Sequence, residues 1–243
     1  MSNPVLLSST NHKNLRVKNE PAPASFSLRN SSIVMQEFPH LALEYPLLFT
    51  KNMDTGSFVC VSVFGFDEGE NLFVENDQWN ALYTPLNIKR QPFMVGTQNK
   101  PGDDQPQESE HVVLIDEADP RVQEQDGEAL FNERGFPTPY LEKMTSMLKA
   151  LKDGFADTKL FIDKLLELDL IAPTTLKIEL INQEQRHIQG FYSIDEGKLQ
   201  SLSGETIAEL HSLNYLKPIY AILTSFGHIY SLIDKKNKKL NAS

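Results

Sequence analysis

The sequence predicts an α+β fold with mainly antiparallel strands and hairpins, on which C-terminal helices pack. Short β-branched and aromatic runs dominate the first half of the chain. Two amphipathic helical patterns follow, and a further strand pair and more helices close the sequence. Because strands and helices do not alternate as βαβα, a doubly wound nucleotide-binding fold is disfavoured.

The N-terminal stretch, residues 1–30, is predicted to be an extended arm. It carries scattered polar residues and the run Glu20-Pro21-Ala22-Pro23-Ala24, which is typical of a segment with little structure of its own. The remaining chain, residues 31–243, is expected to form a single α+β domain.

The strand-forming region begins with a predicted hairpin. Residues 58–66 are β-branched and aromatic, Asp67-Glu68-Gly69-Glu70 is a turn signal, and residues 71–74 return. Two more strands are predicted at 93–96 and 111–116. Residues 97–110 between them contain Pro101-Gly102-Asp103-Asp104 and are expected to form a solvated excursion.

The helical region opens at Thr138-Pro139, an N-cap followed by a proline at the first helical position. One helix is predicted from there to Gly154 and a second over 157–169. Pro173 prevents continuation. Residues 176–180 and 188–194 alternate in polarity and predict a second hairpin, and helices are expected over 204–213 and 218–236.

The amino-acid composition limits the classes of function that the protein can have. The chain has 243 residues, 40% of them hydrophobic, which is enough for a sizeable core. Its single cysteine, Cys60, excludes an intramolecular disulfide and favours a cytoplasmic location. We expect no membrane span, because no window approaches about 20 apolar residues. The formal net charge of -10 disfavours nucleic-acid binding.

No recognised catalytic or cofactor motif occurs in the chain. Phosphate-loop and dinucleotide glycine patterns, nucleophile motifs and paired histidine ligands are all missing. Glu37 and His40 have the Glu-x-x-His spacing of di-iron helices, but Pro39 interrupts it. We therefore predict no metal and no cofactor, and leave open whether the protein is an enzyme.

The segment from Glu75 to Phe93 is the best candidate for a binding site. It gathers the only tryptophan, a tyrosine, two prolines and a Lys-Arg pair in a stretch that is typical of a shaped loop. The candidate binding residues are Trp79, Tyr83, Arg90, Phe93 and Asp116.

Each candidate also has a purely structural interpretation. Trp79 and Tyr83 could stack on a ligand or pin the loop to the core. Arg90 could bind a carboxylate or phosphate, or form an ion pair with the acidic body of the protein. Asp116 follows a buried strand and could be an acid-base residue or a solvated strand end.

Several segments, taken in order, resemble the SapC family, which is named after a bacterial surface-layer-associated protein and is largely uncharacterised biochemically. The resemblance covers most of the chain and is carried by these segments: residues 6–17; Glu37-Phe38; Tyr45-Pro46-Leu47-Leu48-Phe49; Asn71-Leu72-Phe73-Val74 with Trp79; Tyr83-Thr84-Pro85; Arg90-Gln91-Pro92-Phe93; Leu114-Ile115-Asp116; Gly127-Glu128-Ala129-Leu130-Phe131; Gly135-Phe136-Pro137-Thr138; and Gly190-Phe191-Tyr192-Ser193-Ile194-Asp195 with Leu199 and Leu202. Gln91 and Asn132 depart from the family pattern. The resemblance implies a bacterial protein and a link to surface-layer or envelope biogenesis.

Two functions follow as hypotheses. The first is a non-enzymatic, cytoplasmic accessory protein that binds a protein or peptide partner through the 79–93 loop. The second is an enzyme or small-molecule-binding protein with a pocket near Arg90, Trp79 and Asp116.

Overall fold

The computed structural model describes residues 2–98 and 110–242 and confirms the α+β class. The chain forms two compact units. Unit 1 comprises Met1–Pro23 and Leu86–Asp153, and unit 2 comprises Ala24–Pro85 and Gly154–Ser243. Most of the predicted excursion over 97–110 lies outside the described residues.

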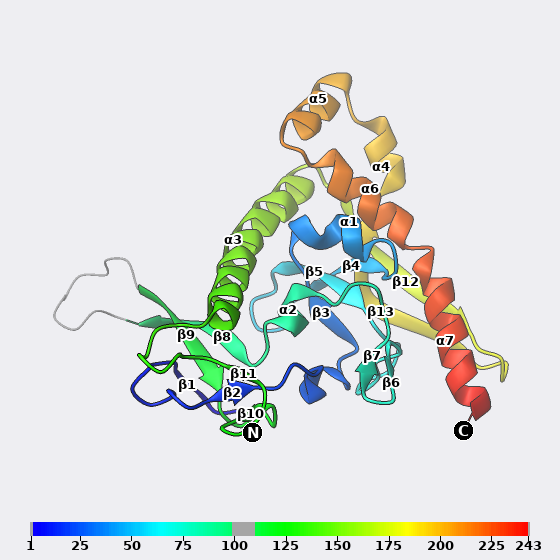
Figure 1. The fold of residues 1–243 in the computed structure, drawn as a ribbon. Helices are drawn as coiled ribbons and strands as arrows, with labels where there is room; N and C mark the ends of the chain where they lie inside the picture. Colours follow the sequence, from blue (N-terminus) through cyan, green and yellow to red (C-terminus); the bar gives the residue numbers. More distant parts are fainter. Residues whose placement is uncertain (1, 99–109, 243) are drawn as a thin grey trace. The chain divides into compact units, whose positions relative to one another are not determined.

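Unit 1 contains two small antiparallel sheets, with strand orders β1-β9-β8 and β10-β2-β11. Its elements are β1 (Pro4–Leu6), β2 (Arg16–Val17), α2 (Leu86–Lys89), β8 (Phe93–Gln98), β9 (Glu110–Asp116), β10 (Val122–Gln123), β11 (Glu128–Ala129) and the first half of α3 (Pro139–Glu167). Both strands of the N-terminal segment therefore pair with strands that come about a hundred residues later (Figure 1).

The core of unit 1 lies between the β1-β9-β8 sheet and α3. Phe93 and Ile115 come from the sheet, and Leu141, Met144 and Leu148 come from one face of the helix. Their spacing of three and four residues places the three helical side chains on one stripe. The predicted strands at 93–96 and 111–116 are thus confirmed as β8 and β9, which pair with each other.

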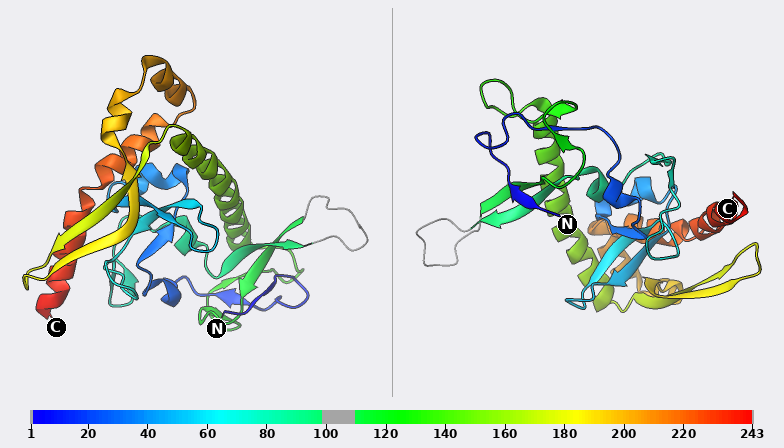
Figure 2. Two further views of the ribbon diagram at one scale, coloured as in Figure 1. Left: turned by 180° about the vertical axis from the view of Figure 1, so that it is seen from behind. Right: turned by 90° about the horizontal axis from the view of Figure 1, so that it is seen from below.

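Unit 2 is built on a five-stranded antiparallel sheet of order β12-β13-β4-β5-β3. Its elements are η1 (Pro23–Ser25, at the boundary), β3 (Asn30–Ser32), η2 (Met35–Glu37), α1 (Phe38–Leu41), β4 (Leu47–Lys51), β5 (Phe58–Val63), β6 (Val74–Glu75), β7 (Gln78–Trp79), the second half of α3, β12 (Ile171–Glu179), β13 (Gln185–Ile194), α4 (Glu196–Ser201), α5 (Gly204–Ser212), α6 (Leu216–Ser225) and α7 (His228–Ala242). Helices α6 and α7 run along the β12–β13 hairpin (Figures 1 and 2).

The predicted hairpin between 58–66 and 71–74 is wrong. Strand β5 pairs with β4 and β3, and the tight connection is the turn after Lys51, where Asn52 Oδ1 accepts hydrogen bonds from the N–H groups of Asp54 and Thr55. The acidic turn at 67–70 instead binds a lysine of α7. The second predicted hairpin is confirmed as β12–β13.

The helix predictions are confirmed in place but differ in their breaks. The two helices expected on either side of Gly154 form one continuous helix, α3. Gly154 is there for packing, because a Cβ atom would lie 2.9 Å from the Cβ of Val34. The helix predicted over 218–236 divides into α6 and α7, which are separated by Phe226 and Gly227.

Candidate functional site

The predicted binding segment is divided between the two units. Trp79 and Tyr83 belong to unit 2, whereas Arg90, Phe93 and Asp116 belong to unit 1.

In unit 2, Trp79 and Tyr83 are tied to Tyr45 by a chain of hydrogen bonds. The indole Nε1–H of Trp79 donates to Tyr45 Oη at 2.9 Å, and Tyr45 Oη donates to the carbonyl oxygen of Tyr83 at 2.6 Å. Trp79 also packs edge-on against Phe64, with ring centroids 5.1 Å apart. Since Tyr45 is fully buried, this chain fixes the loop to the core of unit 2.

Two glutamates hold the backbone and ring of Tyr83. Glu37, which is only 2% exposed, accepts a hydrogen bond from Tyr83 Oη at 3.1 Å. Glu44 Oε2 accepts from the backbone N–H of Leu82 at 2.7 Å and of Tyr83 at 3.3 Å. The ring of His40 stacks on that of Tyr83, with centroids 5.4 Å apart. These contacts come from the segment around α1 and make the 82–83 backbone rigid.

The two tyrosines of this network are hydrogen-bond donors. Burial raises the pKa of Tyr45 well above its usual value, and burial together with the carboxyl group of Glu37 does the same for the pKa of Tyr83. Both hydroxyls are therefore protonated near neutral pH. The arrangement is suited to positioning a loop.

Beside this network, unit 2 exposes two apolar side chains that we call the leucine surface: Leu43 and Leu82. Leu43 is 67% and Leu82 90% exposed. Glu44, the residue after Leu43, accepts the hydrogen bond from the Leu82 N–H. This contact brings the backbone segments that carry Leu43 and Leu82 together.

The sequence pattern did not predict the leucine surface. Its members come from two segments that are distant in the sequence, and the pattern alone does not distinguish an exposed loop leucine from a buried one.

In unit 1, Arg90 folds back on its own loop. Its Nε–H donates to Asn87 Oδ1 at 2.7 Å, and one terminal nitrogen donates to the carbonyl oxygen of Phe93 at 2.7 Å. Burial lowers the pKa of the guanidinium. Both of its hydrogen bonds are to neutral oxygens. Phe93 is fully buried in the unit 1 core. Within residues 2–98 and 110–242, Arg90 forms no ion pair.

Asp116 is the last residue of β9 and binds the N-terminal segment through its carboxylate. Its carboxylate accepts hydrogen bonds from Ser2 Oγ at 2.6 Å, from the Asn3 N–H at 2.7 Å and from the Ala118 N–H at 3.1 Å. Burial raises its pKa, but these hydrogen bonds outweigh that effect and bring the pKa below its ordinary value. Asp116 is thus an ionised acceptor that ties residues 2–3 to the sheet.

The described residues contain no group of three or more His, Cys, Asp or Glu side chains arranged to hold a metal ion. Glu37 and His40, which share the Glu-x-x-His spacing, have separate roles, as the partner of Tyr83 and as the ring stacked on it. Cys60 is fully buried, and burial raises the pKa of its thiol, so it is not a reactive nucleophile.

Two cavities that the sequence did not predict lie among the described residues of unit 1. One, of about 270 Å³, lies between α3 and the β8–β9 pair, and the other, of about 440 Å³, lies between residues 13–16 and 124–133. The second mixes Lys13 and Arg16 with Glu124 and Glu133. None of the five predicted binding residues lines either cavity.

The fold and these sites define an α+β protein with a braced loop, an exposed apolar surface and small unit 1 cavities. A family model described as SapC matches residues 7–232, and the chain belongs to the SapC family. No curated protein and no solved structure matches the chain. No helix among the described residues is long and apolar enough to span a membrane.

Proposed function

We propose that this SapC-family protein is a non-enzymatic accessory protein that binds a protein or peptide partner. The observation that carries the proposal is the 90% exposure of Leu82 on a backbone held by Glu44. An exposed apolar side chain on a fixed backbone loses little conformational entropy on binding, which favours affinity.

The hydrogen-bond network of Tyr45, Trp79 and Tyr83 supports this surface. Trp79 and Tyr83 contribute through their hydrogen bonds to Tyr45 and Glu37, which set the course of the loop. Leu43 and Leu82 then supply the contact. Singly exposed leucines are common, but two highly exposed leucines on backbone segments joined by Glu44 are suited to an interaction surface.

The partner we propose carries apolar side chains next to basic residues. The formal net charge of -10 favours association with a positively charged segment. The same proposal places the protein in the cytoplasm, because its only cysteine is buried and unpaired, and links it to surface-layer or envelope biogenesis through its family. Cell fractionation tests the location.

The binding experiment compares two aspartate substitutions at highly exposed apolar positions of unit 2. Leu82→Asp alters the leucine surface, and Met53→Asp is the matched control in the β4–β5 turn, where Met53 is 94% exposed. A partner captured from native lysate by wild type and Met53→Asp, and lost with Leu82→Asp, supports the proposal once the purified pair reproduces the difference. Equal capture by both variants contradicts it.

A small-molecule pocket near Arg90, Trp79 and Asp116 is not favoured. The oxygens of Asp116 accept from Ser2, Asn3 and Ala118, while Arg90 donates to Asn87 and Phe93. Neither side chain lines a described cavity.

A further inference from the structure

The cavity between α3 and the β8–β9 pair combines an apolar floor with basic side chains. Residues Val95 and Val113 are paired across the two strands, so their side chains share one face of the sheet. His111 lies two residues before Val113 and is on the same face. Leu148 faces these residues from α3.

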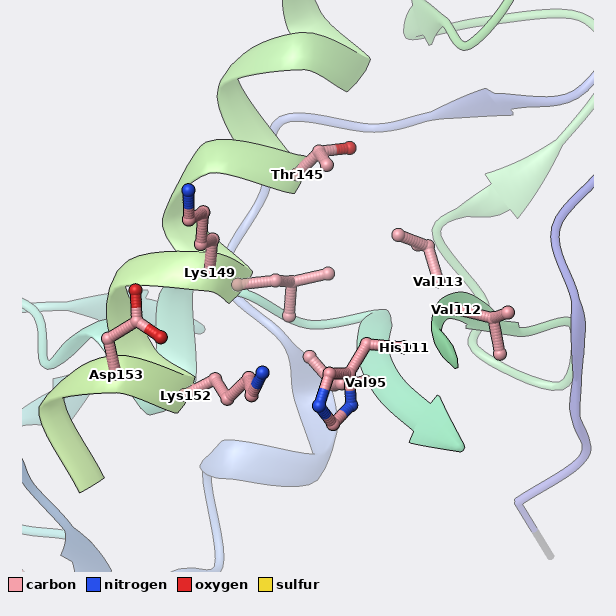
Figure 3. A pocket seen from close by; sticks show the side chains of 9 residues that line it. Val95, His111, Val112, Val113, Thr145, Lys149, Lys152 and Asp153 are labelled. Atoms are coloured by element: carbon pink, nitrogen blue, oxygen red, sulfur yellow. The ribbon is translucent and has the colours of Figure 1, made fainter. Parts of the chain in front are cut away.

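The two lysine side chains at the cavity point in different directions. Figure 3 shows Lys152 extending from α3 toward the ring of His111, whereas Lys149 and Asp153 extend away from that ring. The ion pairs of α3 involve Lys159 and Lys164. Within the described parts of the chain, Lys149 and Lys152 form none. On a protein of formal charge -10, an exposed lysine beside an apolar floor provides a local positive charge that can pair with an anion.

The charge and volume of the cavity define the ligand class. Its lining has two lysines and one aspartate, which leaves one net positive charge when His111 is neutral. A volume of about 270 Å³ corresponds to roughly nine water molecules at about 30 Å³ each. This is smaller than a typical drug-sized pocket, so the occupant is a small molecule.

We propose that this cavity binds a small monocarboxylate with an apolar body, of the size of hexanoate. The carboxylate accepts hydrogen bonds from Lys152 Nζ and from His111, and the apolar body lies on Val95, Val113 and Leu148. A charge-assisted hydrogen bond fixes the orientation of the ligand. The apolar floor removes the hydrocarbon chain of the ligand from water, which stabilises the complex. The site is distinct from the leucine surface, so neither proposal depends on the other.

The test is a titration of the full chain with hexanoate, followed by NMR on the amides of Val113 and Leu148. We expect saturable shifts at these amides. Acetate, which lacks the apolar body, and hexanol, which lacks the charge, are expected to bind at least tenfold more weakly. Inorganic phosphate serves as the probe for a purely ionic site.

Variants at exposed positions separate the two contributions. Lys152→Gln is expected to weaken hexanoate binding about tenfold, the loss expected for one charge-assisted hydrogen bond. Lys143→Gln, an exposed lysine of the same helix that does not line the cavity, is the control and leaves binding unchanged. Val95→Asn is expected to weaken hexanoate but not acetate.

Three results would overturn the proposal. Absence of saturable shifts at Val113 and Leu148 means that the cavity does not take this ligand. If phosphate or acetate binds as tightly as hexanoate, the apolar floor does not contribute to binding. If hexanol binds as tightly as hexanoate, Lys152 does not contribute to binding. Equal effects of Lys152→Gln and Lys143→Gln show that only the overall charge of the helix matters.

Discussion

The hydroxyl of Tyr83 donates a 3.1 Å hydrogen bond to the carboxyl group of Glu37, a residue that is 2% exposed and 46 positions earlier in the chain. This bond joins the loop that carries Leu82 to the segment that opens α1. It makes the course of the loop depend on a buried acid.

Replacing Tyr83 with phenylalanine removes this donor while keeping the ring that stacks on His40. A buried acceptor that loses a partner destabilises the native state by about 1–3 kcal/mol. We expect Tyr83→Phe to lower the free energy of unfolding by that amount in urea titrations. Tyr230→Phe makes the same chemical change at a 76% exposed ring, and its stability should match wild type. Equal stability of the two variants would show that the bond to Glu37 contributes nothing.

A second prediction concerns Lys236, which anchors α7 to the turn at 67–70. Its Nζ lies 2.8 Å from an oxygen of Asp67 and 2.6 Å from one of Glu70, and the side chains of Lys236 and Glu70 are 11% and 8% exposed. Lys236→Met leaves the carboxylate of Glu70 buried without its charge partner. We expect a loss of about 3 kcal/mol in stability near neutral pH.

The control for this change is Lys238→Met on the same helix. Lys238 is 74% exposed and pairs with Asp234 four residues earlier, an arrangement whose loss changes stability by about 0.5 kcal/mol or less. Adding Glu70→Gln to Lys236→Met should recover part of the stability, because the uncompensated charge is then absent. If the double variant is no more stable than Lys236→Met, the loss has another origin.

The same cluster gives stability a pH dependence whose sign can be worked out. The hydrogen bond from Lys236, with that from Arg186, holds the pKa of Asp67 below its ordinary value in the folded state. The resulting stabilisation is present above the unfolded-state value of about 3.9 and is lost as the pH falls through the lower folded-state value.

Lys236 acts at the other end of the pH range. Burial lowers its pKa, but the hydrogen bonds to Asp67 and Glu70 outweigh burial and raise it. Its contribution is present below about 10.4 and is lost as the pH rises through the raised folded-state pKa. In urea unfolding at a series of pH values, Lys236→Met should show a shallower fall at both ends than wild type. Parallel curves would contradict this.

The fold class followed from the sequence because it depends on local patterns. The helical stripe of Leu141, Met144 and Leu148 and the alternation of 176–180 are visible without knowledge of tertiary contacts. Strand pairing was harder, because both turns beside 58–63 carry good turn residues. Lys236, 166 positions beyond Glu70, binds the acids of the second turn, and local sequence does not show that.

The candidate site was predictable only as a segment. The aromatic and proline content of 75–93 pointed to a shaped loop, but Trp79 donates to Tyr45, which is 34 residues earlier. The cavity beside Lys152 was invisible, because a lysine on a helix is normally solvated, and its neighbour His111 comes from a strand 41 residues earlier.

Gly154 gives a prediction in which the usual rule for helices is reversed. Glycine inside a helix is normally less stable than alanine by about 1 kcal/mol. Here a Cβ atom would lie 2.9 Å from both the Cβ of Val34 and Oε1 of Gln36. We expect Gly154→Ala to reduce stability by about 1–3 kcal/mol through overpacking. Gly204→Ala, in open space at the first turn of α5, should be neutral or slightly stabilising. Thermal unfolding of both variants measures the difference.

Gly127 is held by both its backbone conformation and its close approach to β2. Its φ is +102°, in the region that favours glycine, and a Cβ atom would lie 2.5 Å from the carbonyl oxygen of Val17. Gly135 in the same unit also has a positive φ, +80°, but its nearest neighbour, on Ser9, would be 3.7 Å away. The two glycines therefore differ mainly in the steric contact.

We expect Gly135→Ala to lower stability by about 1–2 kcal/mol, the cost of the left-handed conformation for a residue with a Cβ. Gly127→Ala adds a clash with backbone, which no side-chain movement relieves, and should lower stability by clearly more. Hydrogen exchange at the Lys18 amide, which donates to Arg121 beside β2, should accelerate in Gly127→Ala much more than in Gly135→Ala. Equal acceleration in both variants would mean that β2 tolerates the displacement, and that conformation alone requires glycine at 127.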